Sequence, residues 1–407
     1  MKICILGLGY VGLPIATLFA TKGHDVIGID INKSIVETIN KGRIHIHEPG
    51  LEQKLKQAID LGKLTAKTTP EKADVFILAV PTPLTKEKKA DLTYVEKATE
   101  SILPFIEKGN MVILESTVPP GTTEEIIGKK LAKDILLVHC PERILPGTVL
   151  KELTENSRVI GGTSKEASEK AKSLYSSFVE GKIYITTAKT AEFVKLIENT
   201  YRDVNIAFAN ELSLISKKLG LNVREAIQIA NQHPRVNIHH PGPGVGGHCI
   251  AIDPWFIAEK AQESAKMITL ARNTNDSMPL VIAGMAKEMV KGIENPIITI
   301  LGVAYKADID DARETPAEDI IKQLKKEGYT TKIHDPYVKN FPYEIISSIE
   351  NSIQDSDCII LVTDHQSFKN LNPDSIKDLM RTKNLIDTRN CLDKKAWESS
   401  GFKIETI

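Results

Sequence analysis

The segment Pro241-Gly-Pro-Gly-Val-Gly-Gly-His-Cys249-Ile-Ala-Ile-Asp253 places one thiol in a glycine-rich stretch, with a carboxylate four residues later. Glycine has no Cβ and tolerates positive φ, so a substrate could approach such a thiol closely. A thiol that adds to a carbonyl carbon can carry an acyl group as a thioester. The alternative is a packing turn around a buried, inert cysteine. A dinucleotide-binding fingerprint near the N-terminus favours the reactive interpretation, because a hydride acceptor and an acyl-carrying thiol together indicate an oxidation through a thioester.

That fingerprint reads Gly7-Leu-Gly9-Tyr10-Val11-Gly12, between an expected strand over residues 2–6 and an expected helix over 13–21. In this context the glycines turn the chain, admit a pyrophosphate and let the helix pack closely. Asp30 ends the next strand, where a carboxylate would bind a ribose 2′-hydroxyl and repel a 2′-phosphate, so NAD is favoured over NADP. Lys33 could reach the adenosine phosphate or could equally be solvated. A glycine turn without a ligand is the alternative.

Polar side chains follow other expected strands of the same sheet. Thr82 lies in Val80-Pro-Thr-Pro, and Ser116 and Thr117 lie in Glu115-Ser-Thr-Val-Pro-Pro-Gly. Loops at the carboxyl ends of strands line the crevice of a doubly wound sheet, so these residues are candidate contacts for cofactor or substrate. Simple turn formation by proline, serine and threonine is the alternative.

Two further groups of polar residues are candidates for the site, and the first of them points to the same crevice. Glu142 and Arg143 follow a strand in His139-Cys-Pro-Glu-Arg-Ile-Leu-Pro-Gly147. Lys195, Asn199 and Arg202 are spaced to share one face of a long helix expected over 191–219. A polar triplet of this kind is usually exposed to solvent, but the apolar residues around this one make burial plausible.

The elements that must position these residues predict an α/β protein of three domains. Strands alternate with helices over 1–185, which predicts a parallel sheet covered on both faces. Residues 186–290 form a helical middle domain with a long central helix, and 291–407 form a second doubly wound, Rossmann-like domain. The segments 297–302, 331–335 and 357–363 repeat the patterns of 3–7, 26–30 and 74–80. The second copy lacks the glycine triplet, so it could bind a nucleotide but is less suited to a dinucleotide; convergence of two common patterns is the alternative.

Composition excludes several classes of partner. Of 407 residues, 42% are hydrophobic and 26% charged, with a formal net charge of −1, so neither nucleic acid nor an anionic membrane is expected. The five cysteines are odd in number and form no CxxC pair, so neither a disulfide framework nor a metal site is indicated. The chain enters a strand at once and has no long apolar run, and we expect a cytoplasmic protein.

The ordered motifs GLGYVG, VPTP, ESTVPPGT, CPERILPG, KxxxN, GxGVGGHC and YKxDIDDARETPAED resemble those of the UDP-glucose/GDP-mannose dehydrogenase family over essentially the whole chain. The chain is most similar to the branch that acts on acetamido sugars. UDP-glucose members carry a glutamate where Pro146 stands and a lysine where Ile252 stands. The resemblance therefore implies UDP-N-acetylmannosamine as substrate, with UDP-glucose, UDP-GlcNAc or GDP-mannose as alternatives, and a place in polysaccharide biosynthesis.

The resemblance also implies a four-electron oxidation at C6 of the sugar, in which NAD accepts hydride twice. Cys249 would form a thiohemiacetal and then a thioester, which water hydrolyses. Lys195 would stabilise developing alkoxide charge or move a proton. Asp253 would orient Lys195 or a water, and Glu142 would activate the hydrolytic water. Asn199 and Thr117 belong to the same expected catalytic set.

Residues expected to contact the UDP-sugar combine catalytic side chains with basic ones, because arginine matches phosphate oxygens in a bidentate manner. They are Arg143, Ile144, Lys195, Asn199, Arg202, His233, Arg235, Gly246, Lys306, Arg313 and Asn390. Arg313 is alternatively a contact of NAD, together with the fingerprint residues, Asp30, Lys33, Thr82 and Thr117. A structural role is the alternative for His233. Arg389 is a weaker candidate.

The apolar surface of the long helix exceeds what a small domain can cover, which predicts a homodimer or higher homo-oligomer through the middle domain. Two other functional classes stay open. A two-electron hydroxyacid dehydrogenase would not need Cys249, and a non-catalytic nucleotide-sugar sensor would need no reactive thiol.

Overall fold

A computed structural model describes residues 1–46 and 48–407, which divide into two compact units. Unit 1 contains residues 1–198 and 255–262, and unit 2 contains 199–254 and 263–407. Helix α8 (Ala188–Leu219) begins in unit 1 and ends in unit 2, whereas α10 (Asp253–Lys260) begins in unit 2 and ends in unit 1. The division into domains 1–185, 186–290 and 291–407 stays a prediction.

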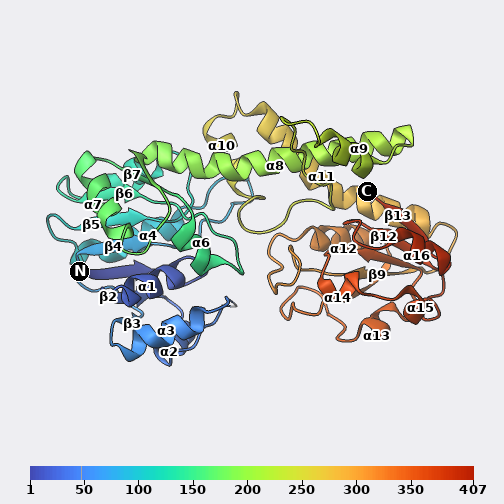
Figure 1. The fold of residues 1–407 in the computed structure, drawn as a ribbon, viewed down its shortest axis with the longest axis horizontal. Helices are drawn as coiled ribbons and strands as arrows, with labels where there is room; N and C mark the ends of the chain where they lie inside the picture. The colour runs from blue at the N-terminus through green and yellow to red at the C-terminus, as the bar shows by residue number, and fades with distance from the viewer. Residues whose placement is uncertain (47) are drawn as a thin grey trace. The chain divides into compact units, whose positions relative to one another are not determined.

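Unit 1 is built on an eight-stranded sheet of order β3-β2-β1-β4-β5-β6-β7-β8 (Figure 1). Its strands are β1 (Lys2–Leu6), β2 (Asp25–Ile29), β3 (Leu64–Lys67), β4 (Val75–Leu78), β5 (Met111–Leu114), β6 (Leu136–His139), β7 (Arg158–Gly162) and β8 (Ile183–Thr187). Neighbouring strands are parallel except β6 and β7. The chain runs from β1 through β2 to β3 and then returns to β4 on the other side of β1, and ligands of such sheets bind at the carboxyl ends beside this switch point.

Helices cover both faces of this sheet. Along β1, Ile3 and Ile5 belong to one apolar cluster, whereas Cys4 and Leu6 belong to another on the opposite face. The remaining helices of the unit are α1 (Gly12–Thr21), α2 (Lys33–Asn40), α3 (Leu51–Asp60), α4 (Thr93–Ile102), α5 (Gly128–Lys130), α6 (Val149–Glu155) and α7 (Lys165–Tyr175), with short η1 (Leu103–Phe105) and η2 (Thr123–Ile127). Burial on both faces explains the nearly continuous apolar runs of the central strands.

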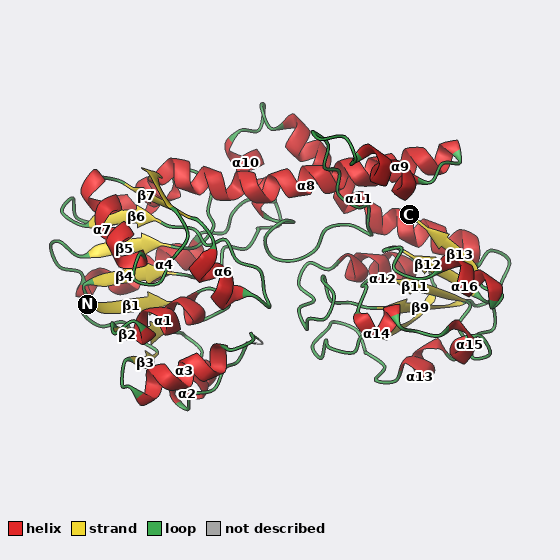
Figure 2. Cartoon of the chain, viewed as in Figure 1, coloured by secondary structure: helices red, strands yellow, loops and turns green. Residues whose placement is uncertain are grey.

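Unit 2 holds a second sheet, of five parallel strands in the order β10-β9-β11-β12-β13 (Figure 2). The strands are β9 (Ile297–Leu301), β10 (Thr330–His334), β11 (Cys358–Leu361), β12 (Asn384–Asp387) and β13 (Lys403–Thr406). The helices are α9 (Val223–Ala230), α11 (Lys266–Met289), α12 (Pro316–Lys326), α13 (Ile349–Ile353), α14 (Gln366–Lys369), α15 (Pro373–Ile376) and α16 (Lys394–Ser399). The expected fold class, α/β with two doubly wound sheets and a helical region that contains a long helix, is confirmed. None of the helices in the described part of the chain is both long and apolar enough to span a membrane.

The two sheets share more than the apolar pattern of their strands. The hydrogen bonds of the turn that follows the first strand are repeated as well. Gly7 and Gly302 follow the first strand of each sheet with φ of 90° and 88°. Their amides donate to the carbonyls of Ile29 at 2.8 Å and His334 at 2.9 Å, respectively. The same turn is therefore built twice.

The carboxylates that close these two turns differ in their surroundings. Asp30 accepts from the amides of Leu8 and Asn32, whereas Asp335 accepts four backbone amides and a ring nitrogen of His365. Burial alone would raise the pKa of Asp335, but the bonds from His365 and the backbone lower it to about 2. Because Asp335 is occupied by its own turn and by His365, its carboxylate is less available to a ligand than that of Asp30.

Helix α8 buries its polar face and exposes its apolar one, the reverse of an ordinary surface helix. The buried polar residues are Glu192, Lys195, Asn199, Thr200, Asp203, Asn210, Ser213 and Ser216. The exposed apolar residues are Phe193, Ile197, Tyr201, Phe208, Ile215 and Leu219. The buried polar face must be held by specific partners, since unpaired buried polar groups are costly.

A buried ion pair ties together the ends of three strands in unit 1. Arg158 on β7 donates to Glu115 Oε1 at 2.5 Å and to Cys140 Sγ at 3.1 Å. Its guanidinium also lies 4.3 Å from the ring centre of Tyr175, whose hydroxyl donates to Glu115. Burial raises the pKa of Glu115, and Arg158 acts in the opposite direction. The loops that follow β5 and β6 therefore start from fixed positions.

Replacing Arg158 by methionine is expected to lower the free energy of unfolding by about 3–5 kcal/mol, because the Glu115 carboxylate would stay buried without its cation. Chemical denaturation checks this. Lys170→Met is the control, since Lys170 forms an exposed pair with Glu166 worth at most about 0.5 kcal/mol. A loss in the Arg158 variant no larger than in the control would contradict the role assigned to the pair.

Candidate active site

The turn between β1 and α1 has the shape that a dinucleotide pyrophosphate requires. A Cβ on Gly12 would lie 1.8 Å from the carbonyl oxygen of Gly7, so the helix can approach the turn only with glycine here. A Cβ on Gly9 would meet nothing within 4 Å, which leaves open space beside the backbone at the start of α1. Helix N-termini attract phosphate groups. These residues and Asp30 fit NAD.

Gly9→Ala is therefore expected to leave the fold intact and to weaken NAD binding by at least about tenfold, or about 1.4 kcal/mol. The added methyl would occupy space that the pyrophosphate needs. Isothermal titration with NAD measures this, and Gly284→Ala is the matched control, since it also adds a methyl to open space but on α11. Equal NAD affinity in both variants would show that the turn does not contact the cofactor.

Hydroxyl groups hold the loops after β4 and β5 to one another. Thr82 Oγ1 donates to the carbonyl of Thr117 at 2.7 Å, and Ser116 Oγ donates to the carbonyl of Val80 at 2.6 Å. Glu192 on α8 accepts from the amides of Gly121 at 2.5 Å and Thr123 at 2.7 Å. Thr82 and Ser116 thus join the two loops and hold Thr117 beside the end of β5, and the expected contacts of Thr82 and Thr117 with ligands stay predictions.

Lys195 and Glu142 meet in unit 1. Lys195 Nζ lies 3.0 Å from Glu142 Oε1, and both side chains are buried. Glu142 Oε2 accepts from the amide of Ile144 at 2.6 Å, which fixes the carboxylate. Burial, with a smaller contribution from Lys195, lowers the pKa of His139 to about 3, so its ring is neutral. The arrangement presents an ammonium group held by a carboxylate and bordered by a neutral imidazole.

Asn199 and Asp253 meet in unit 2, next to the cysteine. Asn199 Nδ2 donates to Asp253 Oδ2 at 2.6 Å, and both residues are buried. The amide of Asp253 donates to the carbonyl of Cys249 at 2.9 Å, so the carboxylate is fixed one turn after the thiol.

The Cys249 side chain is exposed, in contrast to those of Cys4, Cys140 and Cys358. Burial raises the pKa of these three thiols, the first to about 11 and the second to about 12. Reactive cysteines are accessible, whereas structural ones are usually buried, so the exposure of Cys249 fits the reactive interpretation, and its role as a nucleophile stays a prediction.

The glycines before Cys249 serve close packing as much as open space. A Cβ on Gly246 would lie 2.9 Å from Tyr305 Cβ, and one on Gly247 would lie 2.9 Å from Tyr305 Cε2. The amide of Gly247 donates to the carbonyl of Arg313 at 3.1 Å. At these two positions glycine admits the segment around Tyr305, a reason that the spacing of glycines alone does not reveal.

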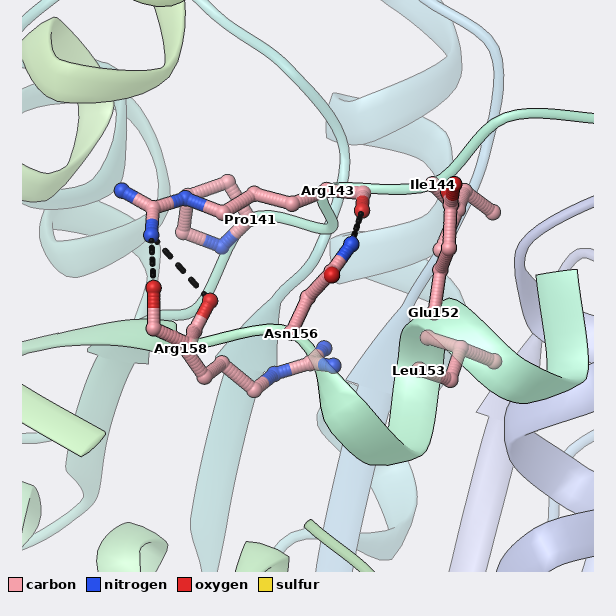
Figure 3. Close-up of a pocket in the computed structure, with 8 residues that line it drawn as sticks. Pro141, Arg143, Ile144, Glu152, Leu153, Asn156 and Arg158 are labelled. Carbon is pink, nitrogen blue, oxygen red and sulfur yellow. Dashed lines mark hydrogen bonds between the residues drawn. The ribbon is translucent and has the colours of Figure 1, made fainter. Parts of the chain in front are cut away.

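The Arg143 side chain forms its hydrogen bonds with other residues of unit 1. Its Nη1 donates to the carbonyl and hydroxyl oxygens of Ser157 at 3.1 and 2.8 Å, and Nη2 pairs with Glu198. Figure 3 shows Arg143 and Ile144 at the edge of a small pocket, where Asn156 donates to the carbonyl of Arg143. These contacts fix the loop that carries Glu142.

The other expected substrate residues lie on accessible segments of unit 2. Arg313 forms a two-pronged pair with Asp311, with Nε–Oδ1 at 2.9 Å and Nη2–Oδ2 at 2.6 Å. Lys306 is half-buried in the loop after β9, which His365 anchors by accepting from the amide of Asp308 at 2.9 Å. Four more residues are exposed: Arg202, His233, Arg235 and Asn390. Lys33 is exposed at the start of α2 in unit 1. Their contacts with ligands stay predictions.

Sequence reasoning missed several buried polar residues, namely His139, Glu192, Asp203, Asn210 and Asn275. A signal for three of them was present, since Glu192, Asp203 and Asn210 recur at helical spacing with Lys195 and Asn199. Such spacing alone does not distinguish a buried polar face from a solvated one.

Three family models cover most of the chain. They describe the UDP-glucose/GDP-mannose dehydrogenase family: the NAD binding domain over residues 1–179, the central domain over 189–277 and the UDP binding domain over 299–394. The chain is 51% identical to a UDP-N-acetyl-D-mannosamine dehydrogenase of Methanocaldococcus jannaschii, covering 100% of this chain and 96% of that one. It is 45% identical to an NDP-N-acetyl-D-galactosaminuronic acid dehydrogenase of Ralstonia nicotianae, covering 95% of each. The solved structure of a UDP-D-ManNAc dehydrogenase from Pyrococcus horikoshii matches with a TM-score of 0.93 and 42% identity, covering 100% of this chain and 99% of that one.

Proposed function

The chain belongs to the UDP-glucose/GDP-mannose dehydrogenase family and is an NAD-dependent nucleotide-sugar dehydrogenase, and from this premise we propose that it oxidises C6 of UDP-N-acetylmannosamine to the carboxylate through a thioester on Cys249. The observation that carries the proposal is the exposed thiol one turn before the buried Asp253–Asn199 pair. An oxidation that stopped at the aldehyde would need no thiol there.

NAD, when bound, accepts a hydride from C6 in each of two oxidation steps. After the first, Cys249 Sγ adds to the aldehyde carbon to form a thiohemiacetal, whose oxidation leaves a thioester. Water then adds to the thioester carbon, the C–S bond breaks, and the sulfur regains its proton. The net change consumes the alcohol, one water and two NAD, and gives the carboxylate, two NADH and three protons.

Lys195 and Glu142 supply the charge and the base that these steps need. The Lys195 ammonium would stabilise negative charge that develops on the C6 oxygen when hydride leaves or a nucleophile adds. Glu142, whose other oxygen is fixed by the Ile144 amide, would accept a proton from the hydrolytic water. Asn199 and Asp253 would orient a water or the sugar beside the thiol.

The substrate assignment rests on the named relatives and on two departures from the UDP-glucose pattern, Pro146 and Ile252. The relative named for an N-acetylgalactosaminuronic acid supports a second candidate, another acetamido sugar. Initial rates of NADH formation with UDP-ManNAc, UDP-GlcNAc, UDP-glucose and GDP-mannose test this. We expect UDP-ManNAc to exceed the others in kcat/KM by at least about tenfold. A preference for UDP-glucose or GDP-mannose would overturn the assignment.

The exposed apolar face of α8 supports a homodimer that covers it. Phe208 is 50% exposed at the middle of this face. Phe208→Asp is therefore expected to convert a dimer into a monomer of 44.9 kDa in light scattering, since loss of a central aromatic contact costs about 2 kcal/mol or more. Tyr94→Asp is the control, since Tyr94 on α4 is similarly exposed, at 45%, and this substitution should leave the dimer intact. A monomeric unmodified protein would contradict this proposal.

The use of NAD and of a reduced thiol suits a cytoplasmic enzyme.

A further inference from the structure

Both ends of the segment that carries Cys249 are tied to the buried polar face of α8. Near its start, the amide of Gly242 donates to Asn210 Oδ1 at 2.8 Å. At its end, Asp253 accepts from Asn199 at 2.6 Å. Asn199 and Asn210 lie roughly three turns apart at 3.6 residues per turn, so they share one face of the helix. The Asn199–Asp253 contact belongs to the site already described, whereas Asn210 has no role in it.

The orientation of the Asn210 amide is set by a chain of hydrogen bonds that ends at an ion pair. Arg272 donates to Asp203 Oδ1 at 2.5 Å, and Asn275 Nδ2 donates to the same oxygen at 2.8 Å. Asn275 must therefore turn its carbonyl oxygen to Asn210, whose Nδ2 donates to it at 2.9 Å. The side-chain oxygen Oδ1 of Asn210 therefore faces the backbone amide of Gly242, because a side-chain amide has its donors on one side and its acceptor on the other.

The start of the cysteine segment is closely packed as well as hydrogen-bonded. The side chains of Asp203, Asn210, Arg272 and Asn275 are each at most 2% exposed. Gly244 has a φ of 125°, and a Cβ there would lie 3.2 Å from the carbonyl oxygen of Asn275 and 3.3 Å from Pro316 Cγ. The backbone between Gly242 and Gly244 consequently has little room to move while the bond to Asn210 is intact.

We propose that Asn210, oriented by Asn275, Asp203 and Arg272, is a positioning residue that fixes the start of the cysteine segment and thereby the direction of the Cys249 thiol. This inference rests on the proposed role of Cys249. A displacement of a reacting group by about 1 Å can cost about 10²-fold in rate, so a segment that lost its bond to Asn210 and stayed attached only nearer its end, at Gly247 and Asp253, would react poorly.

Asn210→Leu keeps the branched shape of the side chain and removes both of its hydrogen bonds. We expect kcat for carboxylate formation to fall by about 10²-fold while the KM for NAD stays within about twofold, because the cofactor turn lies elsewhere. Hydrogen exchange of the peptide spanning 241–249 should become faster, with that of β9 unchanged. Ser213→Ala is the matched control. It removes a hydroxyl from the same buried face that bonds only back to the carbonyl of Asn210 at 2.7 Å, and it should change neither readout.

A variant that keeps kcat within threefold of the unmodified protein, or leaves exchange of 241–249 unchanged, would overturn the proposal. If Asn210→Leu does not fold, exchange of the Gly242 amide in the unmodified protein decides. We expect this amide to be strongly protected, and exchange at the rate of an unstructured amide would overturn the proposal. These exchange readouts need no turnover, so they stand apart from a failure of the proposed function, which would show as carboxylate formation by a Cys249→Ala variant.

Discussion

Cys249→Ala is expected to abolish formation of the 6-carboxylate while NAD affinity stays within about twofold. Without the thiol the second oxidation has no covalent adduct, and removal of a nucleophile from an established constellation typically costs about 10⁴-fold or more. The exposed thiol lies in unit 2 and the cofactor turn lies in unit 1, so the substitution leaves the residues around Gly9 untouched. Mass spectrometry of the product measures the loss.

Cys391→Ala is the matched control for this prediction. Cys391 is half-buried, and burial and nearby carboxylates raise the pKa of its thiol to about 12, so it is not a nucleophile at neutral pH. That variant should form carboxylate at the rate of the unmodified protein. Carboxylate formation by Cys249→Ala at more than about a hundredth of the unmodified rate would reject the thioester.

Lys195→Met is the substitution with the second largest expected effect. The methionine keeps most of the side-chain volume and removes the ammonium group, so negative charge on the C6 oxygen loses its stabilising partner. Removal of one such donor lowers kcat by about 10²–10³-fold. Steady-state kinetics with saturating NAD measures the loss.

Lys189→Met provides the comparison, since Lys189 lies on the same helix with an exposed side chain 3.8 Å from Glu125. It should leave kcat unchanged. A second variant, Glu142→Gln, removes the carboxylate that holds Lys195 and should slow hydrolysis of the thioester. A decrease of less than tenfold in Lys195→Met would show that this ammonium does not serve the reaction.

The fold could be predicted from the sequence because burial on both faces leaves nearly continuous apolar strands. Ile3–Leu6 and Ile297–Leu301 are short apolar runs that each end in glycine, and in the structure both glycines have positive φ. The repeat therefore reflects a backbone requirement, which a sequence records directly.

The candidate site could be predicted only in part. Lys195, Glu142, Asn199 and Asp253 were identified from motifs, but spacing does not reveal which carboxylate accepts from which partner. The structure pairs Lys195 with Glu142 and Asn199 with Asp253. Such pairings depend on tertiary packing, which brings residues more than fifty positions apart into contact.

The polar face of α8 shows a second limit of sequence reasoning. The sequence alone predicts a solvent-exposed side chain at Asn210, because most polar residues on helices are exposed to solvent. Phe193 and Phe208 show the reverse case, since these apolar residues are exposed. A helix that buries its polar side can be recognised only when the partners of that side, such as Asn275 and the Gly242 amide, are known.

The central claim is that one sugar is oxidised twice at the same carbon through Cys249. Counting NADH against limiting UDP-sugar, with the product identified by mass spectrometry, tests it most directly. We expect two NADH for each sugar consumed and a 6-carboxylate as the product. One NADH for each sugar, with an aldehyde or ketone as the final product, would contradict the account.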